Sequence, residues 1–350
     1  MGSVKSLDTL IEASKNVVGE GIFNFSDDFS VFDWGKMPDV IPFKGAALCI
    51  MSAVAFENLR SRFGNNIQSH YRGLNGSHQE LQLVRGLSRP TTKMKVDLFQ
   101  VIKPIFKNGE YDYSALKGQN NYLIPLEIIY RLGLPPGSSI FRRIKEKKLD
   151  YQDLGLDKEP VPGQRLPKPY FEVTTKLEET DRPVTWQEAE KIAHLQKGEI
   201  EKIKEILSRC IDVINLLADK AGLQNEDGKI ELALGPHREI VVVDVFGTLD
   251  ECRFTYQGIS ISKEMLRQYY DPTPWKKEVD EAKKYAKENG IENWKQFVSL
   301  SPPRLPEEWI NTVSWAYQAV ANKMLGKDIF SNIPSIPEII KLYKHLCESL

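Results

Sequence analysis

Two short apolar runs with a polar linker between them constrain the fold of this chain more than any other feature. The runs occupy residues 229–234 and 239–246, and the linker, residues 235–238, reads Gly-Pro-His-Arg. Runs of this length on either side of a Gly-containing linker are typical of a β-hairpin. The sequence therefore predicts two antiparallel strands in this part of the chain.

Each predicted strand carries an acidic residue. The expected register pairs Leu234 with Glu239. Glu231 then opposes Val242, and Asp244 lies diagonal to Glu231 on the same face, roughly 7–8 Å away. Two carboxylates at this separation can hold Mg²⁺ through oxygen ligands, although the polar face of an ordinary sheet has the same spacing. An acid directly after three valines favours the metal site.

The rest of the chain predicts an α+β fold with two domains. With 350 residues, of which 41% are hydrophobic, the chain can bury a substantial core. Apolar and polar residues alternate over 22–32, which predicts a strand in an antiparallel, β-rich N-terminal domain at residues 1–110. Helical spacing over 46–62 predicts one helix inside that domain. An apolar strand at 122–130 follows, in a larger α+β domain at residues 111–270.

A long amphipathic helix is predicted in the second domain. Residues 142–169 before it are charged and Pro-rich without a sustained period, which indicates a loop. Thr185 and Glu188 form a capping box, and the helix then continues to Gly222. Its apolar stripe favours core packing over a partner surface. The stripe contains Ile203, Ile206, Leu207, Cys210, Ile214 and Leu217.

The last part of the chain, residues 271–350, is predicted to be a helical extension. It is rich in charged residues over 278–290 and ends in a helix near 337–350. Packing on the second domain is the simpler expectation for this segment. A contact between subunits of an oligomer is the alternative.

Composition and charge exclude several classes of function. The 47 basic and 48 acidic residues are interleaved, which argues against a nucleic-acid partner. The sequence contains neither an apolar run long enough to span a membrane nor a hydrophobic signal core, so we expect a cytoplasmic protein that does not associate with membranes. Four scattered cysteines and five histidines show no spacing typical of disulfides, zinc or another transition metal.

The run Thr-Thr-Lys-Leu-Glu-Glu-Thr-Asp at residues 174–181 has a composition suited to binding phosphate and amino-acid groups. It places hydroxyls, one lysine and three carboxylates within eight residues. A solvated loop could carry the same residues by chance. Other segments of the chain, which follow one another in a fixed order, favour the functional interpretation over the solvated loop.

In their order, these segments resemble the SAICAR synthetase family. The family pattern SDRISAFD, IPGKG, STKAE, a Glu and an Asp on neighbouring strands, and Ser-Arg-Phe matches residues 26–33, 41–45, 174–178, Glu231 with Asp244, and 252–254. Arg131, the Gly-Ser-Ser at 137–139 and KEMLRQYY from Lys263 also fit. The segments FDWG and YRG and the C-terminal extension make the chain most similar to the longer archaeal type.

The resemblance implies a fold similar to ATP-grasp and kinase-like architectures, with ATP and Mg²⁺ between two domains. It implies a ligase that joins carboxyaminoimidazole ribotide to L-aspartate with release of ADP and phosphate. The carboxylate would first be phosphorylated, because a carboxylate itself is a poor acyl electrophile. Members of the family are often homo-oligomers, but no patch in this sequence identifies an interface.

The resemblance also implies roles for individual residues. Catalytic roles fall to Lys176, Asp250 and Arg253, and ATP contacts to Gly19, Gly21, Thr174, Thr175 and Lys229. Glu231 and Asp244 would be the metal ligands. Substrate contacts would be made by Asp33, Lys44, Arg131, Ser138 or Ser139, Lys263 and Arg267; both serines are kept because the spacing from Arg131 is one residue longer than in the family.

Three departures from the family pattern keep other functions open. The family's GKVRD hairpin is replaced by Gly19-Glu20-Gly21, whose acid has the wrong charge for phosphate. Asp28 replaces a common Arg, and Val245 replaces a common acid. One alternative is an ATP-dependent amide ligase for another heterocyclic carboxylate. The second is a nucleotide-binding regulator without turnover.

Overall fold

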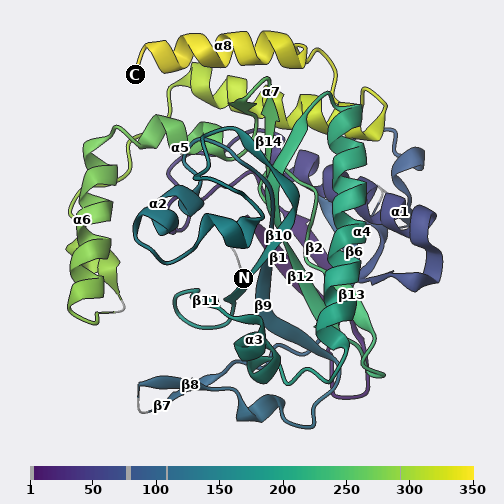
Figure 1. Cartoon of the computed structure of the whole chain (residues 1–350). Coiled ribbons are helices and arrows are strands. Elements are labelled where there is room, and N and C mark those ends of the chain that lie inside the picture. Colours follow the sequence, from purple (N-terminus) through teal and green to yellow (C-terminus); the bar gives the residue numbers. More distant parts are fainter. Residues whose placement is uncertain (1–3, 76–79, 108, 292) are drawn as a thin grey trace.

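The computed structural model describes residues 4–75, 80–107, 109–291 and 293–350, and contains two main β-sheets (Figure 1). All neighbouring strands in the N-terminal sheet are antiparallel. Its order is β1 (Lys5–Ile11), β2 (Gly19–Phe25), β6 (Lys93–Leu98), β4 (Tyr71–Asn75) and β5 (Leu81–Gln82). The predicted antiparallel β structure near the N-terminus is therefore confirmed.

The larger sheet has eight strands. Its main path is β11 (Pro183–Val184), β10 (Gln164–Thr175), β9 (Tyr122–Leu134), β12 (Gln224–Leu234), β13 (Ile240–Val243) and β3 (Gln68–Ser69). Off this path, β14 (Cys252–Tyr256) pairs with β12, and β15 (Ile259–Ser260) pairs with β14. Strand β3 comes from the N-terminal part of the chain and pairs in parallel with β13, so this part of the chain contributes a strand to the larger sheet.

The described residues also contain eight α-helices, which together with the sheets give the predicted α+β class. They are α1 (Lys44–Phe63), α2 (Ser139–Lys145), α3 (Trp186–Ile192), α4 (Glu199–Lys220), α5 (Glu264–Tyr270), α6 (Pro274–Glu288), α7 (Glu307–Leu325) and α8 (Ile336–Glu348). A separate hairpin pairs β7 (Ile105–Lys107) with β8 (Glu110–Asp112).

The predicted hairpin is formed by β12 and β13, but its register differs from the prediction by one residue. Glu231 pairs with Val243 instead of Val242, and Leu234 pairs with Ile240. The reason is that Glu239 belongs to the loop, where its carboxylate accepts a hydrogen bond from the His237 amide at 2.9 Å. The linker is thus one residue longer than its composition suggested.

The diagonal arrangement predicted for the two acids is also wrong, both because of this register shift and because β13 ends before Asp244. Asp244 lies one residue beyond the end of β13 and has a φ of 61°. This left-handed conformation turns the backbone away from the strand direction, so alternation along the strand no longer sets the direction of the side chain.

Helix α1 confirms the helix predicted at 46–62 and begins two residues earlier. Every residue from 44 to 56 is buried, as expected of a helix that is packed on all sides. Its first turn is held by Asp27, whose carboxylate accepts a hydrogen bond from the Gly45 amide at 2.9 Å. Strand β2 ends at Phe25, so the strand predicted at 22–32 is too long: the chain leaves the sheet so that Asp27 reaches the helix.

The predicted long helix is two helices, α3 and α4. Thr185 caps α3 by accepting a hydrogen bond from the Glu188 amide at 3.1 Å, as its sequence predicted. Between the helices, His194 and Gly198 have φ angles of 47° and 89°, which a continuous α-helix cannot contain. All six residues of the apolar stripe are buried in α4, against α1, β12 and α7, so the expectation of core packing is confirmed.

The segment predicted as a loop at 142–169 contains more structure than expected. Helix α2 extends to Lys145, a 3₁₀ turn spans Tyr151–Leu154, and β10 begins at Gln164. A small separate core explains this order, because Leu134, Ile140, Leu154 and Leu166 pack together and are buried. Strand β9, predicted at 122–130, is four residues longer and reaches Leu134, where this core begins.

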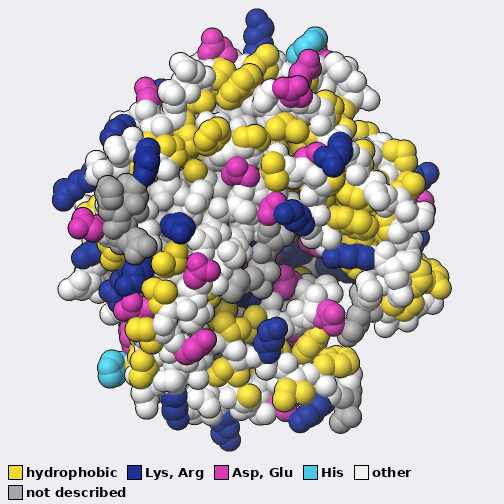
Figure 2. All heavy atoms as spheres, turned by 180° about the vertical axis from the view of Figure 1, so that it is seen from behind, with side chains coloured by type: hydrophobic (Ala, Val, Ile, Leu, Met, Phe, Trp, Pro, Cys, Tyr) yellow, Lys and Arg dark blue, Asp and Glu magenta, His cyan; other side chains and the backbone are white. Residues whose placement is uncertain are grey.

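The C-terminal extension is helical, as predicted, but it packs along α1 of residues 1–110 as well as against the second domain, where packing was expected. Helices α7 and α8 lie side by side above the sheets in Figure 1, and α7 packs along α1 and touches α4. One continuous hydrophobic core includes Val54 of α1, Ile214 of α4 and Val320 of α7. Figure 2 shows the molecule from behind the view of Figure 1, and acidic and basic side chains are interspersed on this face. No helix in the described residues is long and apolar enough to cross a membrane.

Candidate active site

A cavity of about 370 Å³ lies beside the larger sheet and collects many of the predicted residues. Strands β9, β12 and β14, the loop before β14 and the start of α5 contribute its walls. The predicted residues that line it are Arg131, Gly137, Ser139, Lys229, Asp250, Arg253, Lys263 and Arg267. They come from segments up to 136 residues apart, if Arg131 and Arg267 are compared.

Sheet register explains how two of the predicted arginines meet. Asp227 of β12 pairs with Arg131 of β9 on one side and with Arg253 of β14 on the other. Its carboxylate accepts hydrogen bonds from Arg131 Nη1 at 3.2 Å and from Arg253 Nε at 2.9 Å. A second carboxylate, Glu172 of β10, accepts one from Arg131 Nε at 2.5 Å and another from Arg143 of α2.

These five residues, Arg131, Arg143, Glu172, Asp227 and Arg253, are called the arginine network below. Three guanidinium groups against two carboxylates give the network one net positive charge, and Arg131, Asp227 and Arg253 line the cavity. The carboxylates also fix the guanidinium planes, so the remaining N–H groups are oriented before a ligand arrives. Such an array suits a phosphate group, which accepts paired hydrogen bonds.

The two serines considered for the phosphate site have different positions. Ser139 lines the cavity, and its hydroxyl accepts a hydrogen bond from Arg131 Nη2 at 3.3 Å. Ser138 is buried and caps α2, where its hydroxyl accepts from the Ile140 amide at 3.5 Å. Gly137 has a φ of 79°, so a residue with a side chain would be strained there.

A second charged group lies next to the cavity and is called the lysine–carboxylate cluster. It consists of Lys5, Glu127, Lys176, Lys229, Glu231, Asp244 and Glu251. Lys176 Nζ lies 2.5 Å from Glu231 and 3.2 Å from Glu127. Lys229 Nζ lies 2.8 Å from Glu127 and 3.4 Å from Glu251. Lys5 Nζ, from β1, lies 2.6 Å from Asp244.

The cluster contains four acids and three lysines. Glu127 and Glu231 are direct cross-strand partners, an arrangement that is destabilising for like charges unless cations offset it. Burial, together with the charge of Asp244, raises the pKa of Glu231 to about 7. Burial also opposes ionisation of Asp244, but Lys5, Lys176 and Lys229 together outweigh it and lower the pKa of Asp244 to about 2.

The predicted metal ligands, Glu231 and Asp244, thus belong to one cluster. Within the described residues, no group of three or more His, Cys, Asp or Glu side chains is arranged to hold a metal ion. A site here would have two protein carboxylates and would leave other positions for phosphate and water. Hard oxygen donors and excess negative charge both fit Mg²⁺.

The run at 174–181 places its lysine in the cluster, and its first two threonines have different surroundings. Thr174 pairs with Glu127 in the sheet, so it faces the cluster side. Thr175 is fully buried, and its hydroxyl accepts a hydrogen bond from the Arg182 amide at 3.1 Å. Thr175 therefore closes the turn that presents Lys176, and its hydroxyl points away from the cavity.

The glycines at 19 and 21 serve a close approach of two strands. A Cβ atom at Gly19 would collide with the Ile11 carbonyl oxygen, and one at Gly21 would lie 2.7 Å from a methyl group of Leu7. Between them, Glu20 pairs with Lys95 at 2.7 Å. The acid that appeared unsuited to phosphate binding is therefore neutralised by a cation of its own sheet.

Lys44 and Asp250 form a buried ion pair. Lys44, the first residue of α1, is fully buried, and its Nζ lies 2.6 Å from Asp250 Oδ2. Tyr317 of α7 donates a hydrogen bond to the other carboxylate oxygen at 2.6 Å. Burial opposes ionisation of Asp250, but Lys44, Lys263 and the hydrogen bond from Tyr317 together outweigh this effect and lower the pKa of Asp250.

The remaining predicted substrate contacts are near the mouth of the cavity. Lys263 and Arg267 line it, and Arg267 pairs with Glu264 at 2.8 Å. Burial lowers the pKa of Lys263. Asp33 pairs with Lys283 of α6 at 2.6 Å, and its side chain is 85% exposed, so it lies outside the cavity wall.

Sequence reasoning missed several members of the site. Glu127 could have been found, because it is an isolated acid in the apolar strand YLIPLEIIY, the same signal that identified Asp244. Asp227 lies outside the matched segments, Glu251 directly precedes residues 252–254, and neither was part of a predicted motif. Lys5 and Tyr317 carry no local signal, since only tertiary packing brings them to the site.

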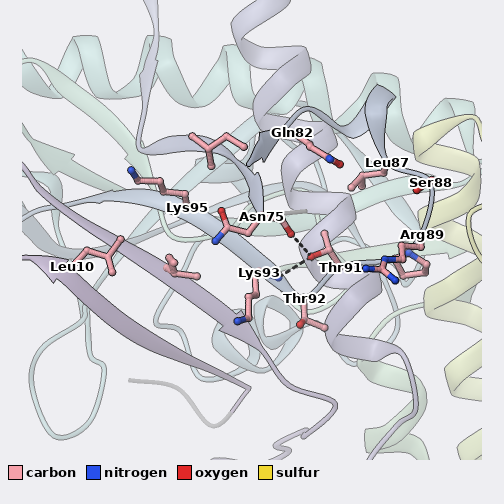
Figure 3. Close-up of a pocket in the computed structure, with 13 residues that line it drawn as sticks. Leu10, Asn75, Gln82, Leu87, Ser88, Arg89, Thr91, Thr92, Lys93 and Lys95 are labelled. Atoms are coloured by element: carbon pink, nitrogen blue, oxygen red, sulfur yellow. Dashed lines mark hydrogen bonds between the residues drawn. The ribbon is translucent and has the colours of Figure 1, made fainter. Parts of the chain in front are cut away.

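A larger cavity, of about 880 Å³, lies on the N-terminal sheet (Figure 3). Lys93, Lys95 and Arg89 are among its lining residues, and Thr91 donates a hydrogen bond to the Asn75 carbonyl at 3.0 Å. None of the residues that line it is a predicted site residue. Of these two cavities, the smaller is the one that predicted site residues line.

Comparisons with known proteins point to one family. A family model described as SAICAR synthetase matches residues 13–282. A protein of Archaeoglobus fulgidus, provisionally named a phosphoribosylaminoimidazole-succinocarboxamide synthase, is 42% identical over 349 residues, 99% of this chain and 100% of that protein. The SAICAR synthase of Saccharomyces cerevisiae, solved with SAICAR, has a TM-score of 0.61 at 19% identity over 95% of both chains. A SAICAR synthetase solved with ADP has a TM-score of 0.54 at 20% identity, over 87% of this chain and 99% of that one.

Proposed function

This chain belongs to the SAICAR synthetase family, and we propose that the arginine network and the lysine–carboxylate cluster are the two halves of its active site. The chain is an ATP-dependent carbon–nitrogen ligase of purine biosynthesis. It joins carboxyaminoimidazole ribotide to L-aspartate and produces SAICAR, ADP and phosphate. One observation supports our assignment most: a single cavity is bordered by both charged groups.

The reaction needs two transfers at one carboxyl group, a phosphoryl transfer to its oxygen and then an acyl transfer to the amine. The ribotide carboxylate attacks the γ-phosphorus of ATP, ADP leaves, and an acyl phosphate forms. The aspartate amine then attacks the acyl carbon, the amine loses a proton, and phosphate leaves as the amide forms. The site must therefore hold two anionic substrates beside a nucleotide and keep water from the intermediate.

In our proposal the arginine network binds the ribotide phosphate. Arg131 and Arg253 are held on both sides of Asp227, so their free N–H groups form a fixed array at the cavity wall. Ser139 adds a hydroxyl in the same place. Because this phosphate does not react, rigid binding is an advantage. It anchors the ribotide while the carboxylate of the same substrate is phosphorylated and then attacked by the amine.

The lysine–carboxylate cluster would receive the ATP phosphates. Lys176 and Lys229 have the charge and position for this role, with Thr174 beside them, and Lys5 is the cation that β1 adds. Lys5 thus supplies the basic contact that the Gly19-Glu20-Gly21 segment lacks. Glu231 and Asp244 would hold Mg²⁺, which when bound would neutralise charge on the phosphates.

The amine of L-aspartate would lie near Asp250, and its carboxylates near Lys263 and Arg267. Asp250 is ionised and lines the cavity, which suits contact with an ammonium group. We further propose that residues 1–110 cover ATP, that residues 111–270 hold the metal and substrates, and that residues 271–350 complete the fold. A homo-oligomer in the cytoplasm is part of the same proposal.

The test is ADP release by the purified protein with Mg²⁺-ATP, carboxyaminoimidazole ribotide and L-aspartate, with each component omitted in turn. We expect release to require all three and to match SAICAR formation measured by absorbance. Release without L-aspartate, or ATP binding without release in the complete mixture, would overturn the proposed assignment.

A further inference from the structure

We propose that Tyr317, in the C-terminal helix α7, is a positioning residue that holds the Asp250 carboxylate in place for the amine of the second substrate. This inference rests on the function proposed above, since it concerns the same cavity. It extends the site to a segment beyond residues 13–282, the part of the chain that the family model matches.

The geometry fixes the Asp250 carboxylate from two directions. Tyr317 Oη donates a hydrogen bond to Oδ1 at 2.6 Å, and Lys44 Nζ donates one to Oδ2 at 2.6 Å. With both oxygens engaged, rotation of the carboxylate would break one bond or both. Each oxygen still has acceptor capacity for a substrate N–H, because a carboxylate offers about four lone-pair sites.

The three groups also hold one another. Lys44 Nζ lies 5.4 Å from the centre of the Tyr317 ring, within cation–π range. Lys44 and Tyr317 are fully buried, and the Asp250 side chain is 5% exposed. In such surroundings a hydrogen bond to a charged carboxylate is worth more than one in water, and water cannot easily replace it.

Helices α1 and α7 bring these groups to one place. Lys44 is the first residue of α1, and α7 packs along α1. A hydroxyl of Ser314, one turn before Tyr317, donates a hydrogen bond to the Pro42 carbonyl at 2.6 Å and fixes the two helices in register. The extension therefore does more than cover the core: it sets the position of a side chain in the cavity wall.

The chain contains a matched control for the loss of a buried tyrosine hydroxyl. Tyr270 of α5 is fully buried, and its hydroxyl has no hydrogen-bond partner within the described residues. Tyr317→Phe and Tyr270→Phe remove the same atom from comparable surroundings. Only Tyr317→Phe removes a hydrogen bond from the Asp250 carboxylate.

The first experiment measures KM and kcat of wild type, Y317F and Y270F for each substrate. Y317F should raise KM for L-aspartate about tenfold or more and lower kcat, with KM for ATP and for the ribotide within about twofold of wild type. Y270F should match wild type. Equal behaviour of both variants, or an equal rise of all three KM values, would overturn the inference. An inactive wild type would overturn the proposed function as well.

A second readout separates positioning from a general loss of structure. Loss of the hydroxyl should raise the pKa of Asp250, so the acidic limb of kcat/KM for L-aspartate moves to higher pH in Y317F and stays in place in Y270F. The charged groups facing Asp250 are Lys44, Lys263 and Glu251. In an Asp250→Asn background, Tyr317→Phe should change KM less than about twofold; a full effect there would overturn the inference.

Discussion

The two charged groups beside the cavity hold their cations in opposite ways. In the arginine network, the guanidinium groups of Arg131 and Arg253 are fixed by Asp227, which lies between them on the central strand β12. In the lysine–carboxylate cluster, the ammonium groups come from three separate segments and each pairs with a different set of acids. Each of these two arginines is held by hydrogen bonds to fixed carboxylates, whereas Lys176 and Lys229 each lie within ion-pair distance of more than one acid.

This difference follows from the chemistry of the two side chains and suits two kinds of phosphate. Arginine keeps its charge and forms paired hydrogen bonds in a fixed plane, which favours a phosphate that only has to be held. Lysine is a mobile point charge, and it can follow a phosphoryl group that changes its attachment. The contrast therefore predicts that damage to the network weakens binding of one substrate, whereas damage to the cluster lowers turnover.

The largest effect is expected for Asp244→Asn. Asparagine tolerates the left-handed backbone at this position and has the same volume, so the fold should be kept. The lost charge should weaken Mg²⁺ binding and lower kcat at least about 100-fold, measured as SAICAR formation over a range of Mg²⁺ concentrations. Glu20→Gln, which removes an acid paired with Lys95, is the control. Near-normal turnover at saturating Mg²⁺ would remove Asp244 from the metal site.

A smaller and more selective effect is expected for Arg131→Lys. Lysine cannot bond Asp227, Glu172 and Ser139 at once, so the fixed array is lost while the charge remains. We expect KM for the ribotide to rise about 10- to 100-fold, the equivalent of one or two charged hydrogen bonds. KM for ATP should change little. Equal changes in both KM values would show that Arg131 acts through the fold.

Arg143→Lys sharpens the same point. Arg143 reaches Glu172 from α2 but is not part of the cavity wall. Its replacement should raise KM for the ribotide less than Arg131→Lys does, because only the support of Arg131 is weakened. An equal or larger effect would place the phosphate nearer to α2 than we propose.

Lys5→Met tests whether the N-terminal sheet takes part in nucleotide binding. Methionine keeps the length of the side chain and removes its charge, so we expect KM for ATP to rise about tenfold, as for the loss of one charged hydrogen bond. KM for the ribotide should stay within about twofold. Lys95→Met, in the same sheet but paired with Glu20, is the matched control. An unchanged KM for ATP in the Lys5 variant would leave the phosphates to Lys176 and Lys229.

The sequence predicted the parts of the fold that local patterns determine. Helix α1, the hairpin of β12 and β13 and the stripe of α4 were found because apolar spacing alone specifies them. The hairpin register was missed because Glu239 takes part in the loop through its side chain. The break between α3 and α4 was missed because it depends on single left-handed residues, which leave no periodic signal.

The candidate site shows the same division. Arg131, Lys176 and Glu231 were predicted because ordered motifs contain them. Tyr317 could not be predicted, since it meets Asp250 from 67 residues away through the packing of α7 on α1. The ATP contact expected of Thr175 and the substrate contact expected of Asp33 both require a particular side-chain direction, and a motif does not specify that direction. Thr175 points into its own turn, and Asp33 lies at the surface.

The smallest expected effects decide between the two serines beside Arg131. Ser139 lines the cavity and bonds the guanidinium, so Ser139→Ala should raise KM for the ribotide a few-fold, the equivalent of one neutral hydrogen bond, about 1 kcal/mol. Ser138 caps α2, so Ser138→Ala should instead lower the free energy of unfolding by about 1 kcal/mol and leave KM nearly unchanged. The measurements are KM for the ribotide, from kinetics, and the free energy of unfolding, from urea denaturation, for each of the two variants. If Ser138→Ala raised KM and Ser139→Ala did not, the helix cap would be the phosphate ligand, and the rigid array would extend from the sheet into α2.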